Sequence, residues 1–175
     1  MTTALPASVF KAYDIRGIVP TQLNADFAFQ LGYALGTQAA LAQVPAIVVG
    51  YDGRHSSPEL GEALMQGIER AGVNTIQIGL APTPVVYYAA HTLHTLSAVA
   101  ITGSHNPPEY NGFKMMLAGK TLHGADIQQL YQLMLNPAPV SNAPGQRIQH
   151  NVIPNYINEI QDTVQLARPM RVAVD

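Results

Sequence analysis

Short apolar runs alternate along this chain with segments of helical periodicity, and this alternation constrains the fold more than any other feature. The runs at 46–50, 75–80, 97–102 and 112–118 predict strands, and residues 10–17 form a further strand-like run. Helices are predicted to begin at Asn24, Ser57 and Thr83, and to span 124–135 and 154–166. This order is typical of a layered α/β domain in which helices cover a central sheet.

The lengths of the connections predict the directions of the strands. Only about ten residues lie between the run at 97–102 and the run at 112–118, whereas a parallel crossover needs about a dozen or more. These two strands are therefore expected to pair antiparallel. Helices separate the other strands, so the predicted fold class is a layered α/β domain with a mixed, mostly parallel sheet between helices.

Two helices carry local signals beyond their periodicity. Gly32 and Gly36 lie about one turn apart in the first helix and predict close packing against another helix. Ser57 is expected to cap the second helix, because Pro58 suits a first helical turn, where no backbone donor is needed. Ser56 is interpreted in the same way, as a capping residue.

The end of the chain differs in composition from the rest. Residues 136–150 are rich in turn-forming residues and predict a linker or a long surface loop. A helix over 154–166 and an apolar run at 170–174, interpreted as a strand, follow this segment. We therefore expect residues 1–150 to form one domain and residues 151–175 to begin a second, truncated domain.

Composition excludes several classes of function. Hydrophobic residues make up 47% of the 175 residues and charged residues only 11%, which favours a packed core over disorder. The net charge of -2 gives no basic surface for nucleic acid, and no apolar run is long enough to cross a membrane. The chain has no cysteine, which fits a reducing compartment. We expect a cytoplasmic protein that binds neither nucleic acid nor membrane.

One segment carries the strongest functional signal. It reads Thr-Gly-Ser-His-Asn-Pro-Pro-Glu-Tyr-Asn-Gly-Phe-Lys over 102–114 and follows a buried strand. Ser104 is thereby placed on a turn that the prolines stiffen, and His105 and Asn106 supply donors beside it. A hairpin would return Lys114 to the neighbourhood of Ser104. A serine hydroxyl needs a base or a preloaded phosphoryl group before it is useful, and a phosphoserine demands donors and cations nearby.

This segment closely resembles the phosphoserine loop of the alpha-D-phosphohexomutases, in particular their phosphomannomutase/phosphoglucomutase group. Three further segments are similar to the same family in the same order, at 10–17, 50–58 and 79–84. The resemblance covers the N-terminal domain of such an enzyme. It implies that Ser104 carries the phosphoryl group, that Lys114 is the general acid/base and that His105 belongs to the catalytic set.

The other matching segments imply further site residues. Tyr13 and Arg16 would contact the phosphate or the sugar. Asp14 would either orient Arg16 or face solvent. Asn106 would be a phosphate donor. Arg54 would belong to the same phosphate and substrate site as a support of the cleft. Its structural partner would be Asp52.

The resemblance also implies cofactors. Family members interconvert hexose 1-phosphate and hexose 6-phosphate through a bisphosphorylated sugar, so a hexose 1,6-bisphosphate is the expected intermediate and activator. They use Mg²⁺, which would contact Ser104 through its phosphate and three aspartates of a second-domain loop that this sequence lacks. We therefore expect the remaining domains of the parent chain as partners, and little or no turnover from residues 1–175 alone.

Three alternatives stay open. The chain could belong to the phosphoglucosamine mutase branch, although Gly103, where many family members carry alanine, favours the phosphomannomutase/phosphoglucomutase group. It could be a non-catalytic module that binds sugar phosphates. Or water could hydrolyse a phosphoserine at Ser104, which would make the protein a phosphatase.

Overall fold

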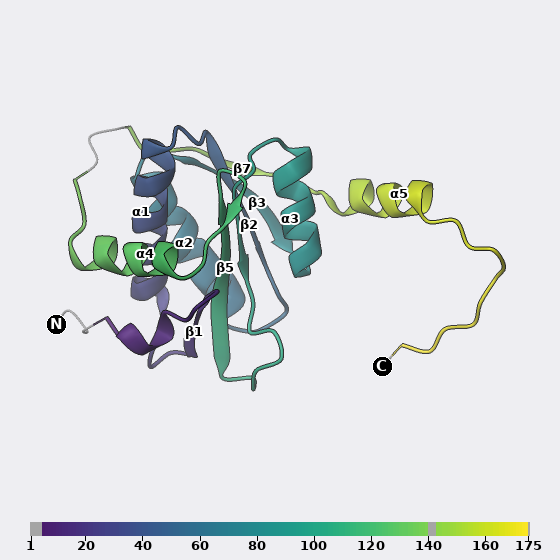
Figure 1. The fold of residues 1–175 in the computed structure, drawn as a ribbon, viewed down its shortest axis with the longest axis horizontal. Helices are drawn as coiled ribbons and strands as arrows, with labels where there is room; N and C mark the ends of the chain where they lie inside the picture. Colours follow the sequence, from purple (N-terminus) through teal and green to yellow (C-terminus); the bar gives the residue numbers. More distant parts are fainter. Residues whose placement is uncertain (1–4, 140–142, 175) are drawn as a thin grey trace.

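The computed structural model describes residues 5–139 and 143–174, and a single sheet lies at its centre. Within those residues its seven strands follow the order β1-β5-β4-β2-β3-β7, with β6 paired to β5 (Figure 1). The strands are β1 (Ile15–Ile18), β2 (Ala46–Tyr51), β3 (Asn74–Leu80), β4 (Ala98–Ile101), β5 (Tyr110–Leu117), β6 (Lys120–Thr121) and β7 (Arg147–Gln149). The helices are η1 (Ala7–Val9), α1 (Ala25–Leu41), α2 (Ser57–Arg70), α3 (Thr83–Thr92), α4 (Ala125–Leu135) and α5 (Ile153–Thr163).

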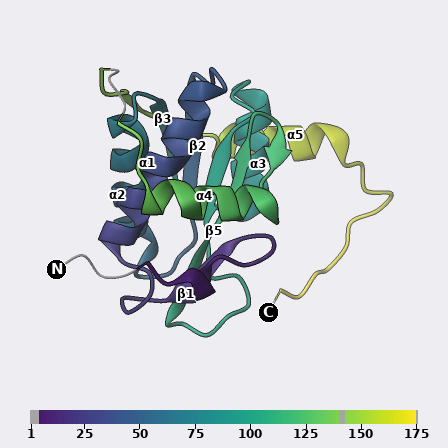
Figure 2. The ribbon, with the colours of Figure 1, turned by 60° about the vertical axis from the view of Figure 1, so that its left-hand side comes forward.

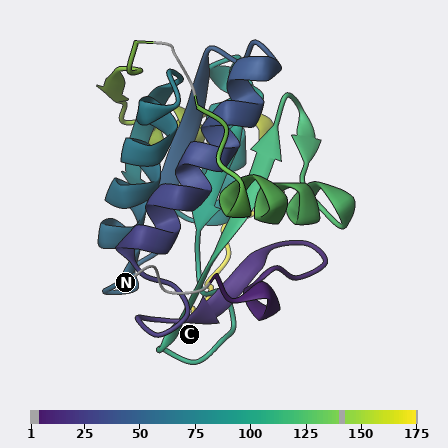
Figure 3. The same cartoon turned by 90° about the vertical axis from the view of Figure 1, so that its left-hand side faces the viewer.

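Helices cover both faces of the sheet. α1, α2 and α4 lie over one face and α3 lies over the other (Figure 1), and Figure 3 looks onto the face that α1, α2 and α4 cover. Strands β4, β2, β3 and β7 are parallel, whereas β5 runs antiparallel to both β4 and β1. The predicted layered fold with a mixed sheet is therefore confirmed, and so is the antiparallel pairing of β4 with β5.

Side chains alternate between the two faces, as the strand period of two requires. Phe113 and Met115 of β5 are buried in the core beneath α1 and α2, while Met116 belongs to the core beneath α3. Lys114 lies between Phe113 and Met115 and therefore points to the α3 side. On β1, Ile15 is buried in the α1 core, so Arg16 points to the same side as Lys114.

Helices α1 and α2 approach each other through glycines. A Cβ atom added to Gly32 would lie 2.0 Å from the Leu64 carbonyl oxygen, and one added to Gly36 would lie 2.8 Å from Ala71 Cβ. Close helix packing at these two glycines was predicted and is confirmed. Among the described residues no helix is both long and apolar enough to span a membrane.

Three predictions near the C-terminus were wrong. The segment 136–150 is not only a loop, because residues 147–149 form β7 and pair with β3. The final helix ends at Thr163, three residues earlier than expected. Residues 170–174 form no strand, because the exposed chain there has no neighbouring strand within the described residues. The boundary at residue 150 stays a prediction.

Helix α5 projects beyond α3, away from the layers (Figures 1 and 2). It has no buried residue, and Ile157 and Ile160 are exposed. Its contact with the domain includes the ring of Tyr156, whose centre lies 5.1 Å from that of Tyr88. Ile153 and Tyr156 at the start of the helix therefore pack against the core beside α3, whereas Ile157 and Ile160 stay exposed.

An ionic cluster fixes β7 at the edge of the sheet. Arg147 donates through Nε and Nη2 to the two carboxylate oxygens of Glu69, at 2.7 and 3.1 Å, and through Nη1 to Glu62. The hydrogen bonds to Glu69 are the main reason that the pKa of Arg147 is raised. The hydrogen bond from Arg147 likewise lowers the pKa of Glu62. A three-residue edge strand gains little from its ladder alone, so this bidentate pair is its principal anchor.

Replacing Arg147 with alanine is expected to loosen β7 while leaving the rest of the domain folded. The amides of Thr75 and His150, which donate to Gln146 and Gln77, should exchange with solvent about tenfold faster. Hydrogen exchange measured by NMR checks this. The exposed Arg168→Ala variant is the control, and equal exchange rates in both variants would contradict the anchoring role.

Candidate functional site

The candidate site lies where two parallel strands end. β2 and β4 are adjacent and parallel, so their carboxyl ends meet at one edge of the sheet. The chain leaves β4 at Ile101 and returns in β5 from Tyr110, which makes residues 102–109 a loop at this edge. Ligands of α/β sheets collect at such edges.

Ser104 occupies an unusual backbone conformation in this loop. Its φ of +52° lies in the left-handed region, where residues other than glycine are uncommon. Its amide donates to Thr102 Oγ1 at 3.0 Å, which holds the turn. The side chain is exposed, and its hydroxyl oxygen lies 3.4 Å from His105 Nδ1. The structure thus presents the Ser104 hydroxyl to solvent beside an imidazole.

Arg54 fills the inside of the loop. Its Nη1 donates to the carbonyl oxygens of Pro107 at 2.6 Å and Tyr110 at 2.8 Å. Its Nη2 donates to the carbonyl oxygens of Asn106 at 2.7 Å and Ser104 at 3.2 Å. One guanidinium therefore organises four carbonyl groups across the whole loop.

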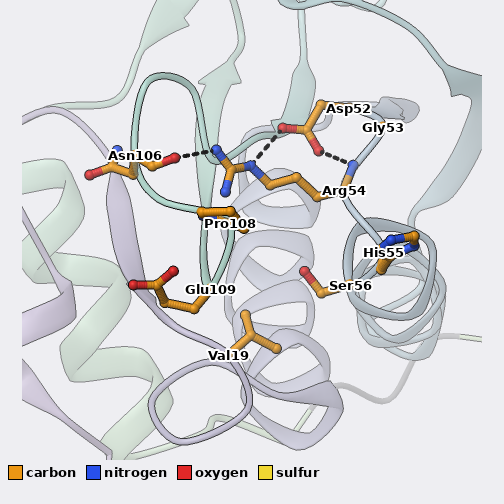
Figure 4. Close-up of a pocket in the computed structure, with 9 residues that line it drawn as sticks. All are labelled: Val19, Asp52, Gly53, Arg54, His55, Ser56, Asn106, Pro108 and Glu109. Atoms are coloured by element: carbon orange, nitrogen blue, oxygen red, sulfur yellow. Dashed lines mark hydrogen bonds and ion pairs between the residues drawn. The ribbon is translucent and has the colours of Figure 1, made fainter.

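Asp52 joins Arg54 to the base of the loop (Figure 4). Its carboxylate accepts from the amides of Arg54 and Gly103 and from Ser57 Oγ, and it lies 3.4 Å from Arg54 Nε. Burial alone would raise the pKa of Asp52, but the hydrogen bonds from Ser57, Arg54 and Gly103 outweigh it, and the pKa is lowered. The pairing of Asp52 with Arg54 expected from the resemblance is present.

The lowered pKa of Asp52 predicts a stability change in acid. A carboxyl whose pKa is lower in the folded state stabilises the fold above its ordinary pKa of 3.8, and this contribution is lost as the pH falls through the folded value. Wild-type protein should therefore lose stability below about pH 4, and Asp52→Asn should lose less over the same range. Urea unfolding from pH 6 down to pH 3 checks this. Asp162→Asn, at an exposed site, is the control, and identical pH profiles for wild type and Asp52→Asn would contradict the prediction.

Asn111 links the start of β5 to the start of α2 by hydrogen bonds. It is fully buried at the start of β5, and its amide donates to Ser56 Oγ at 2.8 Å and Ser57 Oγ at 2.9 Å. Ser57 Oγ in turn donates to Asp52 at 2.6 Å. Ser56 occupies the N-cap position of α2 as predicted, but its side chain makes no capping hydrogen bond. The prediction that Ser57 is the cap was wrong, because Ser57 is the first residue of the helix and its hydroxyl donates to Asp52.

A second charged group lies on the α3 side of the sheet. Asp14 Oδ2 accepts from Arg16 Nη2 at 2.6 Å and lies 3.6 Å from Lys114 Nζ. The strand register brings these residues together, because β1 and β4 pair with opposite edges of β5. Arg16 Nε is buried and has no hydrogen-bond partner among the described residues. The expected orientation of Arg16 by Asp14 is observed, and Lys114 contacts Asp14.

The remaining predicted residues are less constrained. Tyr13 is 75% exposed. Asn106 Nδ2 donates at 3.0 Å to the carbonyl of Gly103, so part of its donor capacity serves the loop itself. Sequence reasoning missed Thr102 and Asn111. No local pattern signals the hydrogen bonds of Asn111, because it lies more than 50 positions from Ser56 and Ser57.

A groove with a volume of about 480 Å³ runs beside the loop (Figure 4). Its walls come from three separate segments and include Val19, His55 and Glu109. Ser104 is not part of its lining, so the groove lies behind the loop and not at the serine hydroxyl.

The described residues do not supply a metal site of their own. They contain no group of three or more histidine, cysteine, aspartate or glutamate side chains that could hold an ion. The carboxylate of Asp52 already accepts three hydrogen bonds, and that of Asp14 is paired with Arg16 and Lys114. Ser104 is thus the single metal contact that the resemblance assigns to this chain.

The strand register places Lys114 opposite Ala100, and its contact is with Asp14. An α/β/α domain that presents a serine at the carboxyl edge of its sheet, on a loop held by an arginine, is suited to binding phosphorylated ligands. The sequence profile described as "Phosphoglucomutase/phosphomannomutase, alpha/beta/alpha domain I" matches residues 7–139. The chain belongs to this family and corresponds to its N-terminal domain.

Named relatives agree with that assignment. The chain is 44% identical over 171 residues to a phosphomannomutase/phosphoglucomutase of Pseudomonas aeruginosa, covering 98% of this chain and 37% of the relative. It is 40% identical over 173 residues to a phosphoglucomutase of Neisseria meningitidis, covering 98% and 38%. The crystal structure of a phosphoglucomutase/phosphomannomutase family protein of Burkholderia thailandensis superposes with a TM-score of 0.89 at 40% identity, covering 95% and 38%. The chain thus spans little more than a third of the length of these relatives.

Proposed function

We propose that this chain is the phosphoserine-bearing domain of an enzyme that interconverts hexose 1-phosphates and hexose 6-phosphates. The observation that carries the proposal is the presentation of Ser104. Its hydroxyl is exposed on a left-handed turn that Arg54 and Asp52 hold from within. A serine hydroxyl is a weak nucleophile by itself, and an exposed turn beside an imidazole is a position from which it could accept and pass on a phosphoryl group.

In the proposed reaction the phosphoryl group moves twice. A sugar hydroxyl oxygen attacks the phosphorus on Ser104 and the bond from phosphorus to Oγ breaks. Lys114, as general base, takes up the proton of the sugar hydroxyl, and His105, whose Nδ1 lies 3.4 Å from Oγ, gives a proton to the departing Oγ. The resulting hexose 1,6-bisphosphate turns over in the site. Ser104 Oγ then attacks its other phosphorus while His105 takes its proton back, and Lys114 returns its proton to the departing sugar oxygen. The resting phosphoserine is restored and no water is consumed.

Two cations support this assignment of roles. Phosphoryl transfer depends on positioning and on stabilising charge at the phosphoryl oxygens. Arg16 and Lys114 lie on one side of the sheet, joined by Asp14. We propose that Arg16 and Tyr13 bind the sugar phosphate, with Asn106 and His105 donating near the phosphoserine.

We further propose that Mg²⁺ is required and that most of its ligands lie outside this chain. The phosphate on Ser104 would be one ligand, and its oxygens are of the hard type that Mg²⁺ prefers. The cation would supply positive charge at the transferring group. The substrate preference is proposed as mannose or glucose phosphates, in line with the names of the Pseudomonas and Neisseria relatives.

The deciding experiment uses the full-length protein with glucose 1-phosphate or mannose 1-phosphate, a trace of hexose 1,6-bisphosphate, and Mg²⁺. Phosphorus NMR should show the 1-phosphate resonance replaced by the 6-phosphate resonance, with no inorganic phosphate. Release of inorganic phosphate without isomerisation would identify a phosphatase instead. Binding without either change would identify a non-catalytic module. Residues 1–175 tested alone should give no more than trace turnover.

A further inference from the structure

We infer that Arg54 is a positioning residue: it fixes the backbone around Ser104 and does not bind the substrate phosphate. This inference concerns the same site as the proposed function and rests on it for its catalytic consequence. It departs from the expectation that the sequence raised, which placed Arg54 among the phosphate-binding residues.

The donors of Arg54 are all engaged by the protein. A guanidinium has five N–H groups in a fixed plane. Nη1 and Nη2 donate all four of their hydrogens to the four carbonyl oxygens of the loop. Nε lies 3.4 Å from the carboxylate of Asp52. A substrate phosphate could bind Arg54 only by displacing one of these contacts.

The charge of Arg54 is also balanced locally. Asp52 forms an ion pair with it, and the two side chains are only 17% and 25% exposed. Arg54 therefore adds little net positive charge toward an incoming phosphate. By contrast, Arg16 and Lys114 share the single carboxylate of Asp14, so this group keeps one positive charge that no carboxylate in it balances. The cations suited to the phosphate are Arg16 and Lys114, and not Arg54.

The contacts of Arg54 explain how the serine keeps its conformation. A positive φ is unfavourable for a residue other than glycine, so the surroundings must hold it. The carbonyl of Ser104 accepts from Arg54, and the amide before it, that of Gly103, donates to Asp52 at 2.9 Å. The guanidinium packs against Gly103 so closely that an added Cβ would lie 2.0 Å from Arg54 Cζ. The pair therefore holds Ser104 on both sides.

The same contacts prepare the loop electrostatically. Carbonyl oxygens carry partial negative charge and would repel the oxygens of a phosphoserine. Arg54 directs the carbonyl groups of Ser104, Asn106, Pro107 and Tyr110 toward itself. Such fixed orientation reduces the reorganisation that charge transfer would otherwise require.

The test compares Arg54→Lys, which keeps the charge but loses the planar fork, with Arg70→Lys at an exposed site on α2. In the unphosphorylated full-length protein, the amides of Asn106 and Tyr110 should exchange with solvent about tenfold faster in Arg54→Lys than in wild type. Their exchange rates should be unchanged in Arg70→Lys. In the activity assay, kcat should fall about tenfold to a hundredfold in Arg54→Lys, while KM changes by less than about twofold. Asp52→Asn, which removes the ion pair without changing size, should loosen the same amides if Arg54→Lys fails to fold.

The outcomes separate this inference from the proposed function. A raised KM with unchanged loop exchange would make Arg54 a substrate ligand and overturn the inference. Unchanged exchange in both Arg54→Lys and Asp52→Asn would also overturn it, whatever the activity. Faster loop exchange in a protein that shows no mutase activity would support the positioning role and remove the proposed function.

Discussion

Replacing Ser104 with alanine is expected to lower the mutase rate of the full-length protein by about a thousandfold or more. The alanine side chain cannot carry a phosphoryl group, so neither transfer step can occur through it. The loop itself should survive, because the contacts of Arg54 with this residue use its main-chain carbonyl. A coupled assay of hexose 6-phosphate formation measures the rate, and intact-protein mass spectrometry measures the loss of the phosphoryl group.

The matched control is Ser8→Ala. Ser8 is exposed like Ser104 but lies in η1, away from the loop. This variant should keep the wild-type rate and the phosphorylated mass. A Ser104→Ala enzyme with more than a tenth of the wild-type rate would show that another group transfers the phosphoryl, and the proposed role of Ser104 would be lost.

Replacing Gly67 with alanine is expected to destabilise the fold by about 3 kcal/mol. The new Cβ would lie 2.1 Å from the Phe29 carbonyl oxygen and 2.7 Å from the Tyr33 amide nitrogen, both backbone atoms of α1. Backbone cannot rotate away as a side chain can, so the two helices must separate. Thermal unfolding followed by circular dichroism should show a drop in Tm of roughly 10 °C.

Gly61→Ala is the internal control for this experiment. Gly61 lies in the same helix, and its added Cβ would meet the side-chain ends of Ile101 and Tyr51 at 3.3 Å, which can shift. Both variants gain the same helix propensity of about 1 kcal/mol, so the difference between them isolates the contact with α1. Gly61→Ala should change the stability by less than about 1 kcal/mol. Equal losses in the two variants would contradict the role of Gly67.

The alternation of strands and helices could be predicted from the sequence because caps and the periodicity of neighbouring apolar residues set it. Asn24 caps α1 as predicted, with its side chain accepting from the Phe27 amide at 2.9 Å. The buried runs of β2 and β4 stand out because every residue of a central parallel strand between two helical layers is apolar. Strand β7 was missed, since three residues of mixed polarity carry no periodicity of their own. It exists because Arg147 reaches Glu69, a contact that spans 78 positions.

The candidate site was likewise predicted from the sequence only in part. The motif around Ser104 was visible because its residues are consecutive, and the ten-residue connection back to Lys114 predicted the antiparallel return. The role of Arg54 was not visible, because its partners lie about 50 positions further along the chain. The buried link from Asn111 to Ser56 and Ser57 likewise crosses more than 50 positions.

By itself, the sequence of this protein determined its layered fold, its antiparallel hairpin, its serine-bearing loop and its family. These depend on the order and periodicity of neighbouring residues. Tertiary structure alone decided which side chains hold the loop. Arg54 and Arg16 are the same residue type, and only the surrounding chain shows that the donors of Arg54 are engaged while Arg16 Nε has no partner among the described residues. The physical reason is that hydrogen-bond satisfaction depends on distances between segments remote in sequence, which no local pattern encodes.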